Sequence, residues 1–417
     1  MVTYASDRLL LVLPVQAFHF NGRIFLDQQA CHGLGLWLEN FEQIILACPT
    51  HDCKPPPDRS PIDGVKGADR LSFVRLPVAY EAFHFFARLP GVFMTLRKQI
   101  SLSSHLHFAI GGLWGDWGAV AALIAARNER GFVVWTDRVE SAVISWRADT
   151  KSGVRRIYSK LLAIATSYYE RYVISRCAVG LFHGMDCFSA YAKFCKRPFL
   201  VHDIHLDKSD QISEEEVRER LSHRRTLQIV YAGRVHGEKG ILDWIQVLHA
   251  ARTNGLDYRA VWYGDGPQLA AARERVLELQ LDSHIQFPGA INDHQALMSK
   301  LKLCDVFLFC HLTPESPRCL IEALVCGLPL IGYDSPYQRD LIQRHGGGIL
   351  TPIGSPTLVA RSLSEFLEKR EEITLAARKD GMGFTAQEVF KHRSELTRLA
   401  SKRNIPAFID PAESESS

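Results

Sequence analysis

A glycine-rich turn with two cations is the segment of this sequence best suited to chemistry. Residues 229–240 read Ile-Val-Tyr-Ala-Gly-Arg-Val-His-Gly-Glu-Lys-Gly, so Gly233, Arg234 and Lys239 lie between an apolar run and a helical pattern at residues 241–251. Backbone N–H groups in such a turn and at the helix N-terminus point at an anion, and Arg and Lys add charge-assisted hydrogen bonds. The segment predicts a surface turn that binds a diphosphate. Taken alone, a plain strand-to-helix turn with two solvated cations is the simpler interpretation.

Three further segments follow in order. They read Val261-Trp-Tyr-Gly-Asp-Gly-Pro, Ile285-Gln-Phe-Pro-Gly and Cys310-His-Leu-Thr-Pro-Glu-Ser-Pro-Arg-Cys-Leu-Ile-Glu-Ala-Leu-Val-Cys-Gly-Leu-Pro. In order and spacing, residues 228–361 resemble the C-terminal domain of family-4-type glycosyltransferases, a retaining group with the GT-B fold. In residues 1–205 the resemblance is architectural only.

The resemblance implies roles for five of these positions. Gly233, Arg234 and Lys239 would face the diphosphate of a nucleotide-sugar donor. Gly264 and Gly289 would lie near the nucleobase.

Two glutamates complete the expected donor site. Glu322 matches the family glutamate that hydrogen-bonds the donor ribose. We expect it at a helix start, where the helix dipole favours a carboxylate. Helix capping is its alternative role. The family separates its two glutamates by seven residues, whereas Glu315 and Glu322 are six apart, and a gapless match would use Pro314. We interpret this as a loop one residue shorter, with Glu315 contacting the donor sugar.

The N-terminal half is expected to bind the acceptor and to close over the donor. Gly22, in Asn21-Gly-Arg23, would bring backbone near the phosphates, although a simple surface turn fits equally well. Asp137 follows a predicted strand at a place where many relatives carry a histidine that faces the donor sugar. The predicted catalytic residues are therefore Glu315, Arg234, Lys239 and Asp137.

Other polar residues of this half are weaker candidates. Asp116, flanked by glycines and tryptophans, ranks above His105 and His107, which we expect by default to be packed or surface histidines. His202, Asp203 and His205 suggest a metal site, but the sequence offers no well-spaced further ligand. We predict no metal.

Strand-length apolar runs alternate with helical patterns along the chain, as in parallel sheets covered by helices. The predicted strands are residues 9–15, 43–48, 71–76, 107–110, 132–136 and 178–182, then 228–232, 258–263, 285–287, 306–310 and 329–332. This pattern predicts an α/β protein with two Rossmann-like, doubly wound domains facing a cleft.

The predicted domain boundaries follow the two strand series. We expect an acceptor-side domain at 1–206, a charged linker at 207–226 and a nucleotide-sugar-binding domain at 227–384. A helix at 385–400 would follow, returning to the N-terminal domain, and then a disordered tail at 401–417.

Composition narrows the function classes. Hydrophobic residues make up 47% and charged residues 23% of the 417 positions, with a net charge of +3, which argues against disorder and against nucleic-acid binding. The ten cysteines form no C-x-x-C pair and suggest reduced core residues. With neither a signal peptide nor an apolar run of about eighteen residues, the chain is expected in the cytoplasm, at most peripheral at the inner face of the membrane.

One local excess of positive charge concerns the membrane. Residues 147–176 contain two acids and seven basic residues, interleaved with aromatic ones: Arg147, Lys151, Arg155, Arg156, Lys160, Arg171 and Arg176. This composition favours an interfacial helix on anionic lipid, with an ordinary solvated helix face as the equal alternative.

The sequence thus predicts transfer of a sugar, with retention and without a metal or cofactor, from a nucleotide-diphosphate donor. The expected acceptor is a sugar or a lipid-linked molecule, in bacterial-type polysaccharide or glycoconjugate synthesis. A non-catalytic nucleotide-sugar-binding protein is the alternative. A dinucleotide-dependent oxidoreductase is disfavoured, because Gly264-Asp-Gly-Pro lacks the third glycine of that fingerprint.

Overall fold

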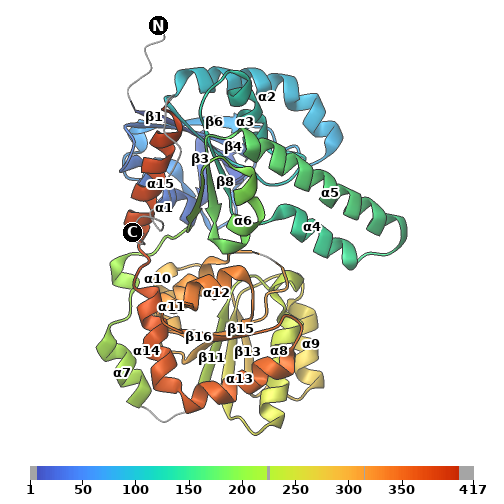
Figure 1. Ribbon diagram of the computed structural model, residues 1–417, viewed down its shortest axis with the longest axis vertical. Helices are drawn as coiled ribbons and strands as arrows, with labels where there is room; N and C mark the ends of the chain where they lie inside the picture. The colour runs from blue at the N-terminus through green and yellow to red at the C-terminus, as the bar shows by residue number, and fades with distance from the viewer. Residues whose placement is uncertain (1–6, 223–225, 314, 403–417) are drawn as a thin grey trace, which may run out of the picture. The chain divides into compact units, whose positions relative to one another are not determined.

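The computed structural model describes residues 7–222, 226–313 and 315–402, so most of the predicted tail lies outside the described residues. The chain divides into two compact units (Figure 1). The first comprises Met1–His205 with Gln387–Ser417, and the second comprises Leu206–Ala386. Among the helices of the described part of the chain, none is long and apolar enough to cross a membrane.

The first unit is built on a mostly parallel sheet with the order β10-β9-β8-β7-β1-β4-β2-β3-β5, in which β6 also pairs with β4. Its parallel strands are β1 (Arg8–Val12), β4 (Gln43–His51), β6 (Leu71–Leu76), β7 (His105–Ala109), β8 (Val133–Thr136), β9 (Val179–His183) and β10 (Pro198–Val201). These strands are near-continuous apolar runs because helices cover both faces of the sheet.

Helices form one layer on each face of this sheet. On one face α3 (Trp117–Arg127) packs between α2 (Ala82–Leu102) and α5 (Gly153–Arg176), and α4 (Glu140–Asp149) packs against α5. On the other face lie α1 (Gln28–Leu38) and α15 (Ala386–Ala400), whose Leu396 and Ala400 pack against β7, β8 and β9. The helix α6 (Gly184–Tyr191) follows β9.

The second unit is a six-stranded parallel sheet with the order β13-β12-β11-β14-β15-β16. Its strands are β11 (Leu227–Ala232), β12 (Tyr258–Tyr263), β13 (Ile285–Gly289), β14 (Val306–Phe309), β15 (Leu330–Tyr333) and β16 (Gly348–Thr351). The strand order reverses between β11 and β14, and ligands of doubly wound sheets bind at the carboxyl ends of strands at such a switch point.

Eight helices of the second unit surround this sheet among the described residues. They are α7 (Glu214–Ser222), α8 (Ile241–Thr253), α9 (Leu269–Glu278), α10 (His294–Lys302), α11 (Arg318–Val325), α12 (Pro336–Ile342), α13 (Pro356–Glu368) and α14 (Arg370–Gly381).

Several segments differ from the sequence expectation. Residues 207–226, expected as a linker, belong to the second unit and contain α7, which packs against α14. The strands β2 (Ala17–Phe20), β3 (Arg23–Asp27) and β5 (Arg59–Pro61) were not predicted, because each is only three to five residues long and most of their side chains are only half-buried. Their pairing is set by tertiary contacts rather than by an apolar pattern.

Candidate functional site

The glycine-rich turn after β11 is positioned by close backbone contacts. A Cβ on Gly264 would lie 1.9 Å from the carbonyl oxygen of Gly233, so the turns after β11 and β12 touch directly. Gly240 has φ 66°, and a Cβ there would lie 1.9 Å from the carbonyl oxygen of Cys310. Only glycine fits these positions, and the turn is thereby held against both neighbouring strands.

Lys239 is buried, with only 7% of its surface exposed, which corrects the expectation that it stands in a surface turn. Its Nζ donates to Oε1 of Glu315 at 2.7 Å, and the two side chains are 9% and 12% exposed. Lys239 comes from the turn after β11 and Glu315 from the loop after β14. The fold therefore joins two predicted catalytic residues at the switch point of the sheet.

Polar side chains that the sequence analysis had not singled out lie behind this ion pair. The hydroxyl of Tyr231 and Nε2 of His311 are 2.7 Å apart, and both residues are buried. Burial, with the Lys239 charge as a second cause, holds the pKa of His311 well below its usual value, so this ring is neutral. Nδ1 of His311 and Oγ1 of Thr313 are buried without a hydrogen-bond partner among the described residues.

Arg234 differs from Lys239 in its surroundings. Its side chain is exposed, and within the described ranges it makes no ion pair or hydrogen bond. A cation beside a glycine-rich turn and free of internal partners is available to an anionic ligand.

Glu322 does not stand at a helix start, which corrects the sequence expectation. The helix α11 begins at Arg318 with Pro317 as its N-cap, so Glu322 lies in the second turn, where the helix dipole favours a carboxylate little. Its half-buried carboxylate is near His294, whose pKa is raised chiefly by a hydrogen bond to Asp210 (Nε2 to Oδ2, 3.3 Å) and further by the Glu322 charge. Asp210 and His294 had not been predicted as site residues.

The two predicted base-side glycines lie side by side. The N–H of Gly264 donates to the carbonyl of Gly289 at 3.0 Å, at the carboxyl ends of β12 and β13. Gly289 has φ 98°, and no atom lies within 4 Å of an added Cβ, so its outer side is open.

In the first unit, Gly22 forms the tip of a β-hairpin. Asn21 and Gly22 have φ of 49° and 74° and connect β2 to β3, in which Phe20 pairs with Arg23. This is the two-residue turn that an Asn-Gly pair favours, so the turn by itself explains the glycine. Asp137 is exposed directly after β8.

Three other candidates of this unit have structural contacts. Asp116 caps α3, accepting from the N–H of Ala119 at 2.8 Å and from that of Gly111 at 3.0 Å, and burial raises its pKa to about 7. His105 and His107 contact α15 through Ser401 and Thr397, respectively. These contacts hold the unit together.

The acid of the suspected His202, Asp203 and His205 metal site is paired with a cation. Arg393 of α15 donates to Asp203 at 3.0 Å. In the described part of the chain, no group of three or more His, Cys, Asp or Glu side chains is arranged to hold a metal ion.

The predicted donor-site residues of the second unit lie in a segment that matches a known protein family. Residues 213–380 match the family described as Glycosyl transferases group 1. Residues 213–380 therefore form a domain of this family.

Two curated bacterial glycosyltransferases are similar to part of this chain. The 2-deoxystreptamine N-acetyl-D-glucosaminyltransferase of Streptomyces fradiae is 28% identical over 42% of this chain and 42% of its own length. The putative colanic acid biosynthesis glycosyltransferase WcaL of Salmonella typhimurium is 24% identical over 41% and 44%, respectively. The matched segment thus spans less than half of each relative.

Solved structures confirm the predicted GT-B fold of this chain. Anabaena HepE in complex with UDP superimposes with a TM-score of 0.66 at 13% identity, covering 95% of this chain and 100% of that one. WaaG, described as a glycosyltransferase involved in lipopolysaccharide biosynthesis, gives 0.63 at 12% identity, covering 93% and 99%.

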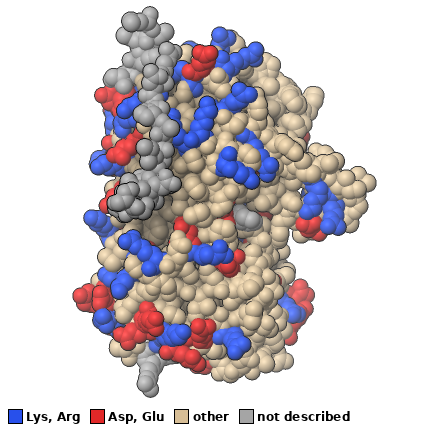
Figure 2. Space-filling view, in the orientation of Figure 1, with Lys and Arg blue, Asp and Glu red and all other residues tan. Residues whose placement is uncertain are grey.

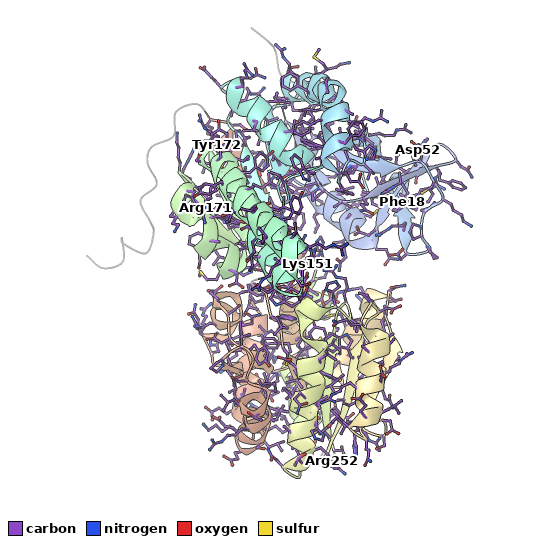
Figure 3. All side chains as sticks on the ribbon, turned by 90° about the vertical axis from the view of Figure 1, so that its right-hand side faces the viewer. Phe18, Asp52, Lys151, Arg171, Tyr172 and Arg252 are labelled. Carbon is purple, nitrogen blue, oxygen red and sulfur yellow. The ribbon has the colours of Figure 1, made fainter. Side chains whose placement is uncertain are left out.

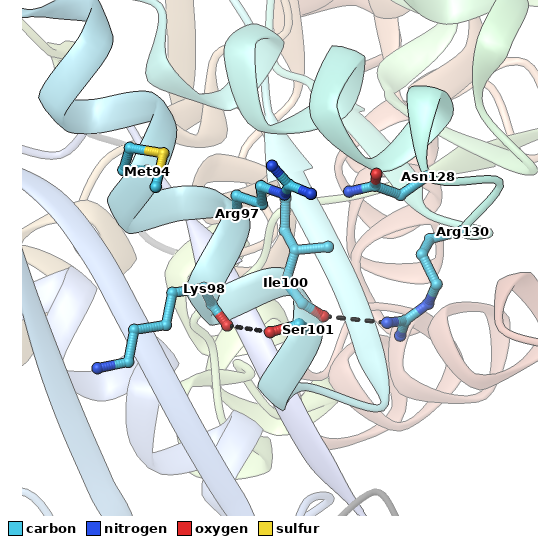
Figure 4. A pocket seen from close by; sticks show the side chains of 7 residues that line it. All are labelled: Met94, Arg97, Lys98, Ile100, Ser101, Asn128 and Arg130. Atoms are coloured by element: carbon cyan, nitrogen blue, oxygen red, sulfur yellow. Dashed lines mark hydrogen bonds between the residues drawn. The ribbon is translucent and has the colours of Figure 1, made fainter. Parts of the chain in front are cut away.

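A cavity of about 490 Å³ in the first unit lies away from the strand ends that bind ligands in this fold (Figure 4). It is lined by Met94, Arg97, Lys98, Ile100, Ser101, Asn128 and Arg130. Most of these lining residues come just before the amino end of β7. Asp116 and Asp137, in contrast, follow the carboxyl ends of β7 and β8, respectively. The Arg130 guanidinium donates to the backbone carbonyls of Ile100 and Ser103, so it helps to close this edge of the unit.

Proposed function

We propose that this chain transfers a sugar, with retention, from a nucleoside diphosphate sugar to an acceptor. The observation that carries the proposal is the Lys239–Glu315 pair, 2.7 Å long and largely buried, beside the exposed Arg234 at the switch point of the second sheet. A carboxylate that orients a lysine next to a second cation is suited to a group that bears both phosphate charge and sugar hydroxyls.

In the proposed mechanism the two cations act on the leaving group. As the sugar–phosphate bond breaks, negative charge grows on the diphosphate, and Arg234 and Lys239 stabilise it without a metal. Glu315 holds Lys239 in place and contacts the sugar, and the new bond forms on the face that the nucleotide leaves. Lys239 is held before substrate arrives, so little reorganisation is needed.

The nucleoside is proposed to bind beside these phosphates. Glu322 would accept hydrogen bonds from the ribose, with His294 and the buried Asp210 next to it. Gly264 and Gly289 would let the base approach the backbone at the ends of β12 and β13. HepE was solved with UDP, which makes uridine nucleotides the first donors to test.

The acceptor is proposed to be a sugar or a lipid-linked molecule of polysaccharide or glycoconjugate synthesis. The relatives named above support this class, since one is described by colanic acid biosynthesis and another by an aminocyclitol acceptor. Gly22 and Asp137 of the first unit are proposed to contribute to donor phosphate and sugar binding.

A non-catalytic nucleotide-sugar-binding protein is the second candidate. Asp137, where many relatives carry a histidine, and the six-residue spacing of Glu315 and Glu322 favour it. Both candidates predict donor binding, but only the first predicts turnover.

Thermal stabilisation by a panel of nucleotide sugars, followed by an assay for released nucleoside diphosphate, tests the proposal. We expect one donor to raise the unfolding temperature and to be consumed by hydrolysis or transfer. Stabilisation without consumption under any acceptor condition would favour the binding protein. No stabilisation by any donor would reject both.

A further inference from the structure

We infer that the helices α2 and α5 form a docking surface for the face of an anionic lipid bilayer. We call this the α2–α5 surface. Its apolar members, all exposed, are Phe83, Phe86 and Met94 of α2 with Val154, Ile157, Tyr158, Leu161, Ile164, Tyr168 and Tyr172 of α5.

The helix α5 has two opposite apolar faces. Ala163 and Val173 lie on the face that is buried against the unit. The seven large residues of its other face are 52% to 82% exposed. Because successive residues of a helix are rotated by about 100°, these seven side chains fall within roughly one third of the helix circumference. A helix with one apolar face already buried gains no folding stability from a second, so the outward stripe indicates a partner.

The helix α2 extends the stripe on the same side of the first unit. Both helices pack against α3, which lies between them, so they flank it in one layer. Phe83 is 81%, Phe86 58% and Met94 63% exposed. Figure 3 shows α5 crossing the side that faces the viewer, with Lys151 at one end and Tyr172 at the other, and α2 above it.

Basic side chains border the apolar stripe. Arg88, Arg97 and Lys98 of α2 and Arg155 of α5 are exposed. Among the described residues, Arg156 and Lys160 share a single acid, Asp149, at 3.1 and 2.8 Å. Figure 2 shows Lys and Arg side chains near the tip of the projecting α4–α5 pair.

The combination of an apolar stripe and a basic border points to an anionic bilayer. Three tyrosines and several aliphatic residues on one helix face, bordered by Lys and Arg, are typical of a helix that lies in the headgroup region. Each basic residue near an anionic surface adds electrostatic attraction, and the aliphatic side chains add apolar burial. The contact is therefore a peripheral one, with α5 parallel to the membrane.

Co-sedimentation of the full chain with vesicles tests this inference without any donor, so its outcome is independent of the proposed transfer reaction. We expect binding to phosphatidylcholine vesicles that contain phosphatidylglycerol, weaker binding without it, and loss as salt rises. The double substitution Ile157→Gln and Leu161→Gln is expected to weaken binding about tenfold or more. Arg155→Gln should weaken it less and reduce the salt dependence.

Matched controls lie on the second unit. Leu277, which is 64% exposed, and Leu358, which is 44% exposed, are changed to Gln together, and Arg361→Gln matches the charge change. These variants should bind vesicles like the parent. The inference is overturned if the parent binds no anionic vesicle at low salt or if the α5 variants bind as well as the controls. It is also overturned if the parent self-associates without vesicles and Ile157→Gln with Leu161→Gln abolishes that association, because the surface would then be a protein interface.

Discussion

Arg234 and Lys239 carry the same charge in the same turn, yet their environments give them different roles. The side chain of Arg234 is exposed and has no internal partner within the described ranges, whereas Lys239 is 7% exposed and paired with Glu315. Replacing Lys239 would leave a largely buried carboxylate without its cation, which destabilises proteins strongly. A loss of activity in Lys239→Ala would therefore mix lost folding with lost catalysis.

Arg234→Ala is the cleaner test of phosphate stabilisation. We expect kcat/KM for the donor to fall by a factor that corresponds to about 2–4 kcal/mol of lost transition-state stabilisation. The reason is the loss of one charge-assisted contact to the charge that develops on the diphosphate. The unfolding temperature should stay unchanged. Steady-state kinetics and thermal unfolding are compared with Arg361→Ala, an exposed arginine on α13, and equal kinetics in the two variants would reject the assignment.

Glu322→Gln and Glu315→Gln should separate the nucleoside side of the site from its sugar side. Glu322→Gln removes an ionic acceptor for the ribose, so calorimetry should show UDP binding weaker by about 1–3 kcal/mol. Glu315→Gln should change UDP affinity little and should depress transfer of the intact donor, because its contact is to the moving sugar. Parent-like transfer by Glu315→Gln would show that transfer needs neither a sugar contact from Glu315 nor its ion pair with Lys239.

At the scale of elements, the helix α5 also carries a buried acid. Glu170 is 2% exposed and accepts a hydrogen bond from the Tyr191 hydroxyl at 2.9 Å. Burial raises the pKa of Glu170 to about 8, and the nearby Asp116 carboxyl has its pKa raised to about 7 for the same reason. The contact between α5 and α6 thus holds a carboxyl that is favoured in its neutral form.

This burial predicts that the first unit loses stability as the pH rises. When folding raises the pKa of a carboxyl, its neutral form stabilises the folded state fully at pH values below the pKa that the group has in the unfolded chain. For Glu170 this stabilisation is lost as the pH rises toward 8. We expect the unfolding free energy to fall on the order of 2–5 kcal/mol from about pH 5 to about pH 8. Denaturant unfolding at several pH values measures this loss.

Glu170→Gln should reduce that pH dependence, because an amide keeps the Tyr191 contact and does not ionise, while the Asp116 carboxyl keeps its own contribution. Asp149→Asn on α4, where the acid is exposed, serves as the control and should keep the slope of the parent. A parent stability that is flat or that rises over this pH range would contradict the prediction.

At the scale of the whole molecule, the chain leaves the first unit at Leu206 and returns to it at Gln387. The returning helix α15 is anchored by Arg393, which is 5% exposed. Its guanidinium carbon lies 4.0 Å from the Trp135 ring centroid and 5.2 Å from that of Trp37, and it pairs with Asp203. Aromatic and ionic contacts thus attach the C-terminal helix to the sheet.

Arg393→Ala should loosen α15 from the first unit. Loss of a buried ion pair and of its cation–π contacts is expected to cost about 2–4 kcal/mol of unfolding free energy. Limited proteolysis should then cut within α15, and the unfolding temperature should fall. Lys391→Ala changes an exposed cation of the same helix and should resist protease like the parent. Equal resistance of both variants would show that Arg393 is not the anchor.

The sequence by itself determined the alternating α/β pattern and the donor-side residues of the second unit. Buried parallel strands are apolar runs that stand out locally, and Gly233, Arg234, Gly264 and Glu322 lie in short segments whose order and spacing are visible without a fold. Strands such as β16, β2 and β3 escaped prediction, because they are short and mostly half-buried, and because their places in the sheets depend on pairing with β15, β4 and β5.

Only the tertiary structure decided which charged groups meet. Glu315 and Lys239 are separated by 76 positions, and no local pattern shows that the loop after β14 places the acid 2.7 Å from the lysine or that both are largely buried. Likewise, the sequence showed that α5 is basic and aromatic, but the packing of α3 and α4 determined which of its faces is buried and which stays exposed. Spacing along the chain defines the faces of a helix, whereas burial depends on what packs against it.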